Sequence, residues 1–107
     1  MKINFHIADD NITEKDKTLI EQKLQKLKRF VKAEPLTFDL YITDEADKSN
    51  DRGIDKSVRL AAQFNSEQFF VENIDQESMR AFAFCYKKME IALERYHEKA
   101  VDWKTAE

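Results

Sequence analysis

The sequence predicts an α+β domain with the element order β-α-β-β-β-α, in which two helices pack on one face of a four-stranded mixed sheet. This prediction rests on two patterns. Four short segments alternate between apolar and polar residues, as half-buried strands do, and two longer segments repeat apolar residues at helical spacing. Stacking both helices on one sheet face buries both kinds of apolar surface, so we expect the other sheet face to meet solvent.

The first half of the chain supplies a strand, a helix and a second strand. Residues Lys2–Ala8 alternate in polarity and predict the first strand. A helix is expected from Thr13, a residue type that caps helices, to about Lys32, and Pro35 stops it from continuing. Its core-facing stripe comprises Ile20, Leu24, Leu27 and Val31. The alternating segment Leu36–Thr43 predicts the second strand.

The second half supplies two more strands and a long helix. The polar stretch Asp44–Asp55 reads as a loop, and strands are expected at Ser57–Phe64 and Gln68–Ile74 with a hairpin turn between them. The final helix is expected from Asp75 to about Lys99, with an inner face of Met79, Phe82, Cys85, Tyr86, Met89, Leu93 and Tyr96. We therefore expect one domain over 1–99 and a short C-terminal tail over 100–107.

Composition excludes several kinds of site in this chain of 107 residues. Nucleotide-binding loops and the hydrolase nucleophile elbow need at least two glycines, and Gly53 is the only one. One cysteine and two distant histidines, His6 and His97, do not match any zinc spacing. The missing phosphate loops and metal ligands disfavour an enzyme, so we expect no enzymatic activity, no metal, no cofactor and no small-molecule substrate. No apolar run approaches the roughly 20 residues that cross a bilayer, so we expect no membrane partner and a cytoplasmic location.

The net charge of −3 hides a strongly uneven distribution. The expected first helix, Thr13–Lys32, carries seven basic residues against three acidic ones, whereas Asp39–Asp55 carries two against six. The total charge alone argues against a nucleic-acid partner. The local distribution instead indicates a molecule with one basic and one acidic region.

Basic residues also gather on particular helix flanks. Lys23 and Lys26 share a flank of the first helix, and Lys88, Arg95 and Lys99 share a flank of the last one. If the helices lie side by side, their outer faces form a cationic strip suited to phosphate oxygens. The same pattern is also typical of ordinary solvated helix faces, so the charges alone leave both interpretations open.

Several segments resemble one known protein family. These segments are Asn11–Glu14, the helical run Lys23–Phe30, the hairpin at Asn65 and the terminal segment Lys88–Lys99. Together with the element order, they resemble the ribosome hibernation-promoting factor and ribosome-associated inhibitor family over residues 1–99. The chain resembles the short form of that family, which lacks a second, dimerising domain.

The resemblance implies a translation inhibitor that acts in hibernation and stress without catalysing a reaction. It implies binding to the small ribosomal subunit and its rRNA, in the channel that mRNA and tRNA use. The family's basic positions match six residues of this chain, which the resemblance makes candidates for RNA-phosphate contacts. These are Lys17, Lys23, Lys26, Lys88, Arg95 and Lys99.

Two apolar residues on the expected outer face of the last helix support an alternative. Ile91 stands where the family commonly has arginine, and Phe84 precedes it by seven residues, so both fall on one stripe. Such a stripe can mark a protein contact, although scattered exposed apolar residues are also normal. The alternative function is a divergent protein-interaction module or a homodimer that uses Phe84 and Ile91.

Overall fold

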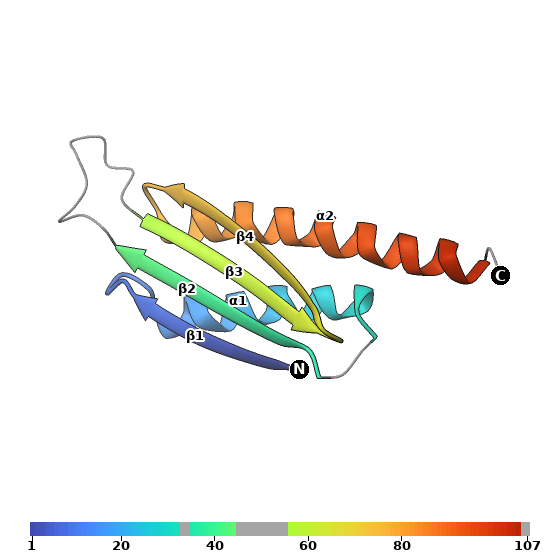
Figure 1. Cartoon of the computed structure of the whole chain (residues 1–107). Helices are drawn as coiled ribbons and strands as arrows, with labels where there is room; N and C mark the ends of the chain where they lie inside the picture. The colour runs from blue at the N-terminus through green and yellow to red at the C-terminus, as the bar shows by residue number, and fades with distance from the viewer. Residues whose placement is uncertain (33–34, 45–55, 106–107) are drawn as a thin grey trace.

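The computed structural model describes residues 1–32, 35–44 and 56–105, with side chains as far as Lys99. Its elements, shown in Figure 1, are β1 (Lys2–Ala8), α1 (Glu14–Leu27), the short 3₁₀ helix η1 (Lys28–Phe30), β2 (Thr37–Asp44), β3 (Lys56–Phe64), β4 (Glu67–Asp75) and α2 (Ser78–Thr105). The predicted order β-α-β-β-β-α is therefore confirmed. Of the acidic loop expected at Asp44–Asp55, Asp44 ends β2 and the rest lies outside the described residues.

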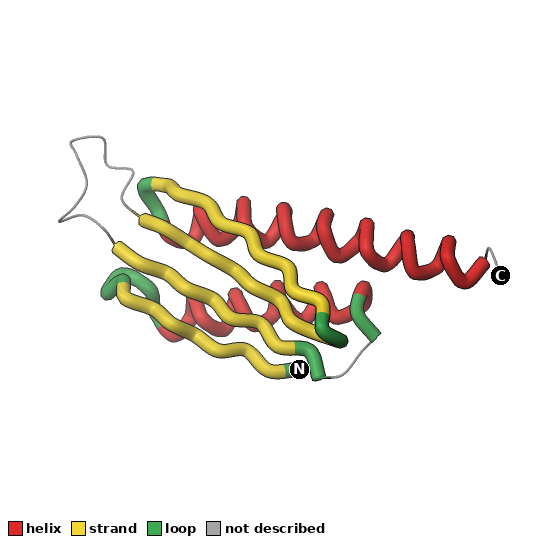
Figure 2. Tube along the Cα trace, in the orientation of Figure 1, coloured by secondary structure: helices red, strands yellow, loops and turns green. Residues whose placement is uncertain are grey.

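The four strands form one mixed sheet in the order β1-β2-β3-β4. Strands β1 and β2 are parallel, with Phe5 opposite Leu40, because α1 carries the chain back between them. The remaining neighbours are antiparallel. Both helices cover the same face of this sheet (Figure 2), as the sequence predicts.

Helix α1 begins as predicted but ends earlier. The Thr13 hydroxyl accepts a hydrogen bond from the backbone N–H of Asp16, and the Asp16 carboxylate accepts one from the N–H of Thr13, both at 3.1 Å. The prediction of a helix to Lys32 is wrong, since the α-helix ends at Leu27. The last turn tightens into η1, and Val31 is extended at φ −128°, ψ 105°, which turns the chain toward β2 while keeping Val31 buried.

Helix α2 is displaced toward the C-terminus relative to its expected bounds. Asp75 belongs to β4, where it pairs with Lys56, and its carboxylate accepts the N–H of Glu77 at 3.2 Å. The helix therefore starts at Ser78 rather than Asp75. It also continues to Thr105, past the expected end at Lys99, and its C-terminal part extends beyond the sheet (Figure 1).

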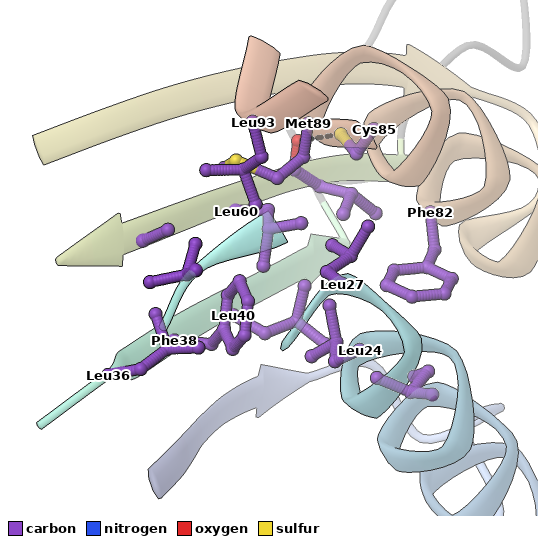
Figure 3. Packing of buried hydrophobic residues seen from close by; sticks show 14 of the residues in the cluster. Leu24, Leu27, Leu36, Phe38, Leu40, Leu60, Phe82, Cys85, Met89 and Leu93 are labelled. Carbon is purple, nitrogen blue, oxygen red and sulfur yellow. Dashed lines mark hydrogen bonds between the residues drawn. The ribbon is translucent and has the colours of Figure 1, made fainter. Parts of the chain in front are cut away.

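The hydrophobic core lies between the sheet and the two helices (Figure 3). Leu24 and Leu27 of α1, Leu40 of β2 and Met89 of α2 are fully buried there. Cys85 is also buried, its thiol donates to the carbonyl oxygen of Val58 at 3.3 Å, and burial raises the pKa of this thiol to about 11. Among the described residues, the outer surface of the helix layer and the open face of the sheet are left for partners.

Candidate nucleic-acid interface

Helix α1 and the η1 turn that follows it meet α2 along a seam, which two contacts define. The ammonium nitrogen of Lys23 lies 5.5 Å from the ring centroid of Tyr86, a cation–π distance. Farther along the seam, a guanidinium nitrogen of Arg29 lies 3.4 Å from a carboxylate oxygen of Glu90. The first contact shows which flank of α1 faces α2, and both contacts show which flank of α2 faces the seam.

Lys23, which contacts Tyr86, lies on the flank of α1 that faces this seam, and Lys26 follows it by three positions on the same helix. Both are exposed. They line a shallow hollow of about 430 Å³ together with Leu19, Gln22 and Gln25. We call Lys23 and Lys26 the seam group, because they place two positive charges on the wall of one surface depression.

Lys17 lies apart from the seam group. Lys23 follows it by six positions, which places the two about 120° apart around the helix, on either side of the buried stripe. The Lys17 ammonium lies 3.2 Å from a carboxylate oxygen of Glu14. Its charge is therefore directed away from α2 and is partly offset by its neighbour.

Lys88, Arg95 and Lys99 lie on the opposite flank of α2, and Lys88 contacts β4. Lys88 Nζ donates to the backbone carbonyl oxygen of Glu72 at 2.9 Å and to the side-chain oxygen of Asn73 at 3.4 Å. Arg95 and Lys99 follow Lys88 by seven and eleven residues, which returns them to nearly the same side of the helix, and both are exposed. We call these three residues the strand-side group.

The six predicted contact residues therefore do not form one continuous strip. The structure brings five of them into the seam group and the strand-side group, with Lys17 outside both. Between the groups lies the outer face of α2, which carries Phe84, Lys87, Ile91 and Glu94. The assignment of the six residues to RNA phosphates stays a prediction.

Glu90 moderates the positive charge of the seam. It pairs with Arg29 and with Lys87, in each case at 3.4 Å, and only 18% of its side chain is exposed. Burial, and secondarily the charge of Glu90, raises the pKa of Tyr86 above its ordinary value, while Arg29 lowers it. The Tyr86 phenol, whose ring lies beneath Lys23, therefore stays protonated at neutral pH.

Sequence reasoning did not assign a role to Arg29. Besides its pair with Glu90, its guanidinium carbon lies 4.5 Å from the ring centroid of Phe30, so it links η1 to α2. The basic run at the end of the first helix is visible in the sequence. The pairing with Glu90 depends on how α1 and α2 align along their axes, which periodicity does not reveal.

Sequence reasoning also missed an aromatic pair on the open face of the sheet. The rings of His6 and Tyr41 stack at 4.4 Å with 9° between their planes. Asp39, beside them, accepts a hydrogen bond from the Asn4 side chain at 3.0 Å. The alternation of the two strands places these residues toward solvent, but only the parallel register brings His6 opposite Tyr41.

Within the described residues, no group of three or more histidine, cysteine, aspartate or glutamate residues is placed to hold a metal ion. None of the helices in this part of the chain is both long and apolar enough to cross a membrane.

Comparison with known proteins shows the fold. The N-terminal domain of Protein Y from Thermus thermophilus matches with a TM-score of 0.71 and 20% sequence identity, covering 90% of this chain and 99% of that one. A ribosomal subunit interface protein from Coxiella burnetii matches with a TM-score of 0.66 and 15% identity, covering 90% and 97%. No family model and no curated protein sequence matches the chain. The resemblance drawn from the sequence is thus confirmed at the level of the fold.

Proposed function

We propose that the chain binds the small ribosomal subunit and inhibits translation by occupying the channel of mRNA and tRNA. In this proposal it acts by steric occlusion, catalyses no reaction, and meets the ribosome in the cytoplasm. The observation that carries the proposal is the exposure of the seam group and the strand-side group on one layer of the fold. A protein with the same fold is described as a ribosomal subunit interface protein, which supports the ribosome as the partner.

The two cationic groups have the chemistry that phosphate binding requires. The Arg95 guanidinium can hold two phosphate oxygens at once, and the ammonium groups of Lys23, Lys26 and Lys99 act as point charges. Lys88 uses two of its three N–H donors on Glu72 and Asn73, so one donor is left for a phosphate. The RNA backbone would approach the helix layer from its outer side and contact both groups.

The open face of the sheet suits RNA less well. Arg59 pairs there with Glu72 at 3.5 Å, and Asp39 places a carboxylate beside the His6 and Tyr41 rings. Stacking on aromatic rings contributes to RNA binding when the surrounding groove is positive. On this face the charges largely cancel, so we assign the phosphate contacts to the helix layer.

The proposal is tested by measuring binding to purified small ribosomal subunits at increasing salt concentration. Phosphate contacts release counterions, so the logarithm of the binding constant should fall linearly with the logarithm of the salt concentration. Neutralising two contacting cations should reduce both the affinity and this slope. Absence of binding at every salt concentration would refute ribosome binding itself.

Three double variants locate the contact. Lys23→Gln with Lys26→Gln removes the seam group, and Arg95→Gln with Lys99→Gln removes most of the strand-side group. Lys2→Gln with Arg59→Gln makes the same change in net charge on the open sheet face and serves as the matched control. We expect each helix variant to weaken binding at least about 10-fold and the control less than about 2-fold. Equal losses in all three would indicate unspecific attraction and contradict the assigned interface.

A competition experiment tests the channel. Protein bound in the mRNA and tRNA channel should lower the binding of mRNA and initiator tRNA to the subunit and should inhibit translation of a reporter mRNA in vitro. Retained ribosome binding without competition would leave the ribosome as partner and overturn the assignment to the channel.

A contact with another protein through α2 is the second candidate function. Phe84 and Ile91 support it, because 51% and 39% of their surface on α2 is exposed. Both residues lie between the two cationic groups rather than in the core, which favours a contact at this face.

A further inference from the structure

The outer face of α2 carries apolar surface that the fold itself does not bury. Phe84 and Ile91 are seven residues apart, so they lie almost in line along the helix axis, and both are exposed. The opposite side of the same helix supplies Cys85, Met89 and Leu93 to the core, and these are fully buried. The helix is thus apolar on two faces, and within the described residues only one of them packs against the rest of the chain.

Charges are divided along this face. Arg80 and Lys87 lie toward the N-terminal end of the helix, whereas Glu94 and Glu98 lie toward the C-terminal end, and all four are exposed. Arg80 pairs with Asp75 and Glu77, and Lys87 pairs with Glu90, in surface contacts of 3.4 Å. Within the described part of the chain, Glu94 and Glu98 have no ion-pair partner.

We infer that this face pairs with the same face of a second copy, in an antiparallel dimer with two-fold symmetry. An antiparallel arrangement brings the basic half of one helix against the acidic half of the other, so the face is complementary to itself. A parallel arrangement would bring like charges together.

Helix geometry gives this dimer a consistent register. With the two-fold axis at the level of Met89, Arg80 lies level with Glu98 of the second copy. Measured along the helix axis, Lys87 then lies about 4.5 Å from Glu94 of the second copy. Phe84 lies at about the same axial distance from Ile91 of the second copy. The apolar pair therefore lies beside the pair of Lys87 with Glu94, and the pair of Arg80 with Glu98 lies toward the end of the contact.

The free edge of β4 fits a second copy less well. Strand β4 carries Glu67, Glu72 and Asp75 and no basic residue. Antiparallel pairing of two β4 strands about Val71 would place Glu67 opposite Asp75 of the other copy, which is repulsive. Lys88 also occupies the backbone carbonyl of Glu72, an acceptor on this strand. We therefore infer that the second copy docks on α2 rather than on the edge of β4.

Two matched isoleucine variants test the dimer by sedimentation equilibrium at low salt, over protein concentrations from micromolar to millimolar. We expect the mean mass to rise from 12.7 kDa toward twice that value. Ile91→Asp should weaken association at least 10-fold, while Ile74→Asp on the open sheet face, where Ile74 is 57% exposed, should not change it. A monomer at every concentration, or association sensitive only to Ile74→Asp, would overturn the inference.

A charge exchange tests the antiparallel arrangement. Lys87→Glu and Glu94→Lys should each weaken association, and the protein with both changes should regain it, because each new residue then meets its opposite on the other copy. The two positions are seven residues apart, too far along the helix to pair within one chain. Thermal unfolding of each variant verifies that the monomer is folded. Failure of the doubly changed protein to associate more tightly than both single variants would overturn this arrangement.

Discussion

The ammonium nitrogen of Lys88 lies 2.9 Å from the backbone carbonyl oxygen of Glu72, which belongs to the edge strand β4. An edge strand leaves backbone groups without a neighbouring strand, and a lysine that reaches one of them satisfies it and also deters pairing with another chain. One of the six predicted RNA contacts thus also has a structural role. Binding and stability effects at this residue must be separated.

Replacing Lys88 with methionine should lower the free energy of unfolding by about 1 kcal/mol, because a charge-assisted hydrogen bond at the protein surface is lost. Arg95→Met lies on the same flank of α2 and should change stability by less than about 0.5 kcal/mol. Urea unfolding measures both values. Equal stability of the two variants would mean that the contact of Lys88 with Glu72 contributes nothing to stability. Both variants should bind ribosomal subunits more weakly than the wild type.

The sequence was sufficient to predict the sheet and both helices, because alternation and helical periodicity arise from the same burial that forms the core. Val31 illustrates the limit of this reasoning. It belongs to the predicted buried stripe and is 3% exposed, but it reaches the core from an extended segment rather than from a helix. Periodicity reports which residues are buried and does not report where a helix ends.

Leu24 and Leu19 provide a matched test of the buried stripe on α1. Leu24 is fully buried, whereas Leu19 is 46% exposed. Leu24→Ala should cost about 2–5 kcal/mol, since it leaves a cavity beneath the sheet, and Leu19→Ala should cost less than about 1 kcal/mol. Denaturant unfolding at one pH measures both. Similar costs for the two leucines would contradict the packing of α1 on the sheet.

The candidate interface was less predictable than the fold. Helical projection correctly places Lys88, Arg95 and Lys99 on one flank, because that relationship is contained within a single helix. Whether this flank lies near Lys23 depends on how α1 and α2 pack together, which no local pattern specifies. The cation–π contact of Lys23 with Tyr86 and the pair of Arg29 with Glu90 arise from that packing.

Cys85 should make stability fall at alkaline pH. Its thiol has a pKa of about 11 in the folded protein against 9.0 for a free thiol, because burial disfavours the thiolate. Below pH 9 both states hold the proton and stability is complete. Between pH 9 and 11 the unfolded state releases the proton first, so the free energy of unfolding falls, by about 1 kcal/mol at pH 10.

Urea unfolding of the wild type and Cys85→Ala from pH 8 to 10 measures this effect, and the variant should show a smaller decline. Parallel declines would contradict the shifted pKa.

The turn between β3 and β4 should be stabilised by glycine. Asn65 and Ser66 form its two central residues with φ angles of 49° and 65°, a left-handed conformation that costs a serine roughly 1 kcal/mol. Turns of this kind favour Asn-Gly. Ser66→Gly removes the steric cost but increases the conformational entropy of the unfolded chain, so we expect the free energy of unfolding to rise by up to about 1 kcal/mol.

Ser66→Val introduces a β-branched residue and should instead destabilise the protein by more than about 1 kcal/mol. Thermal and urea unfolding of the two variants give the comparison, and a Ser66→Gly protein less stable than the wild type would contradict the observed turn.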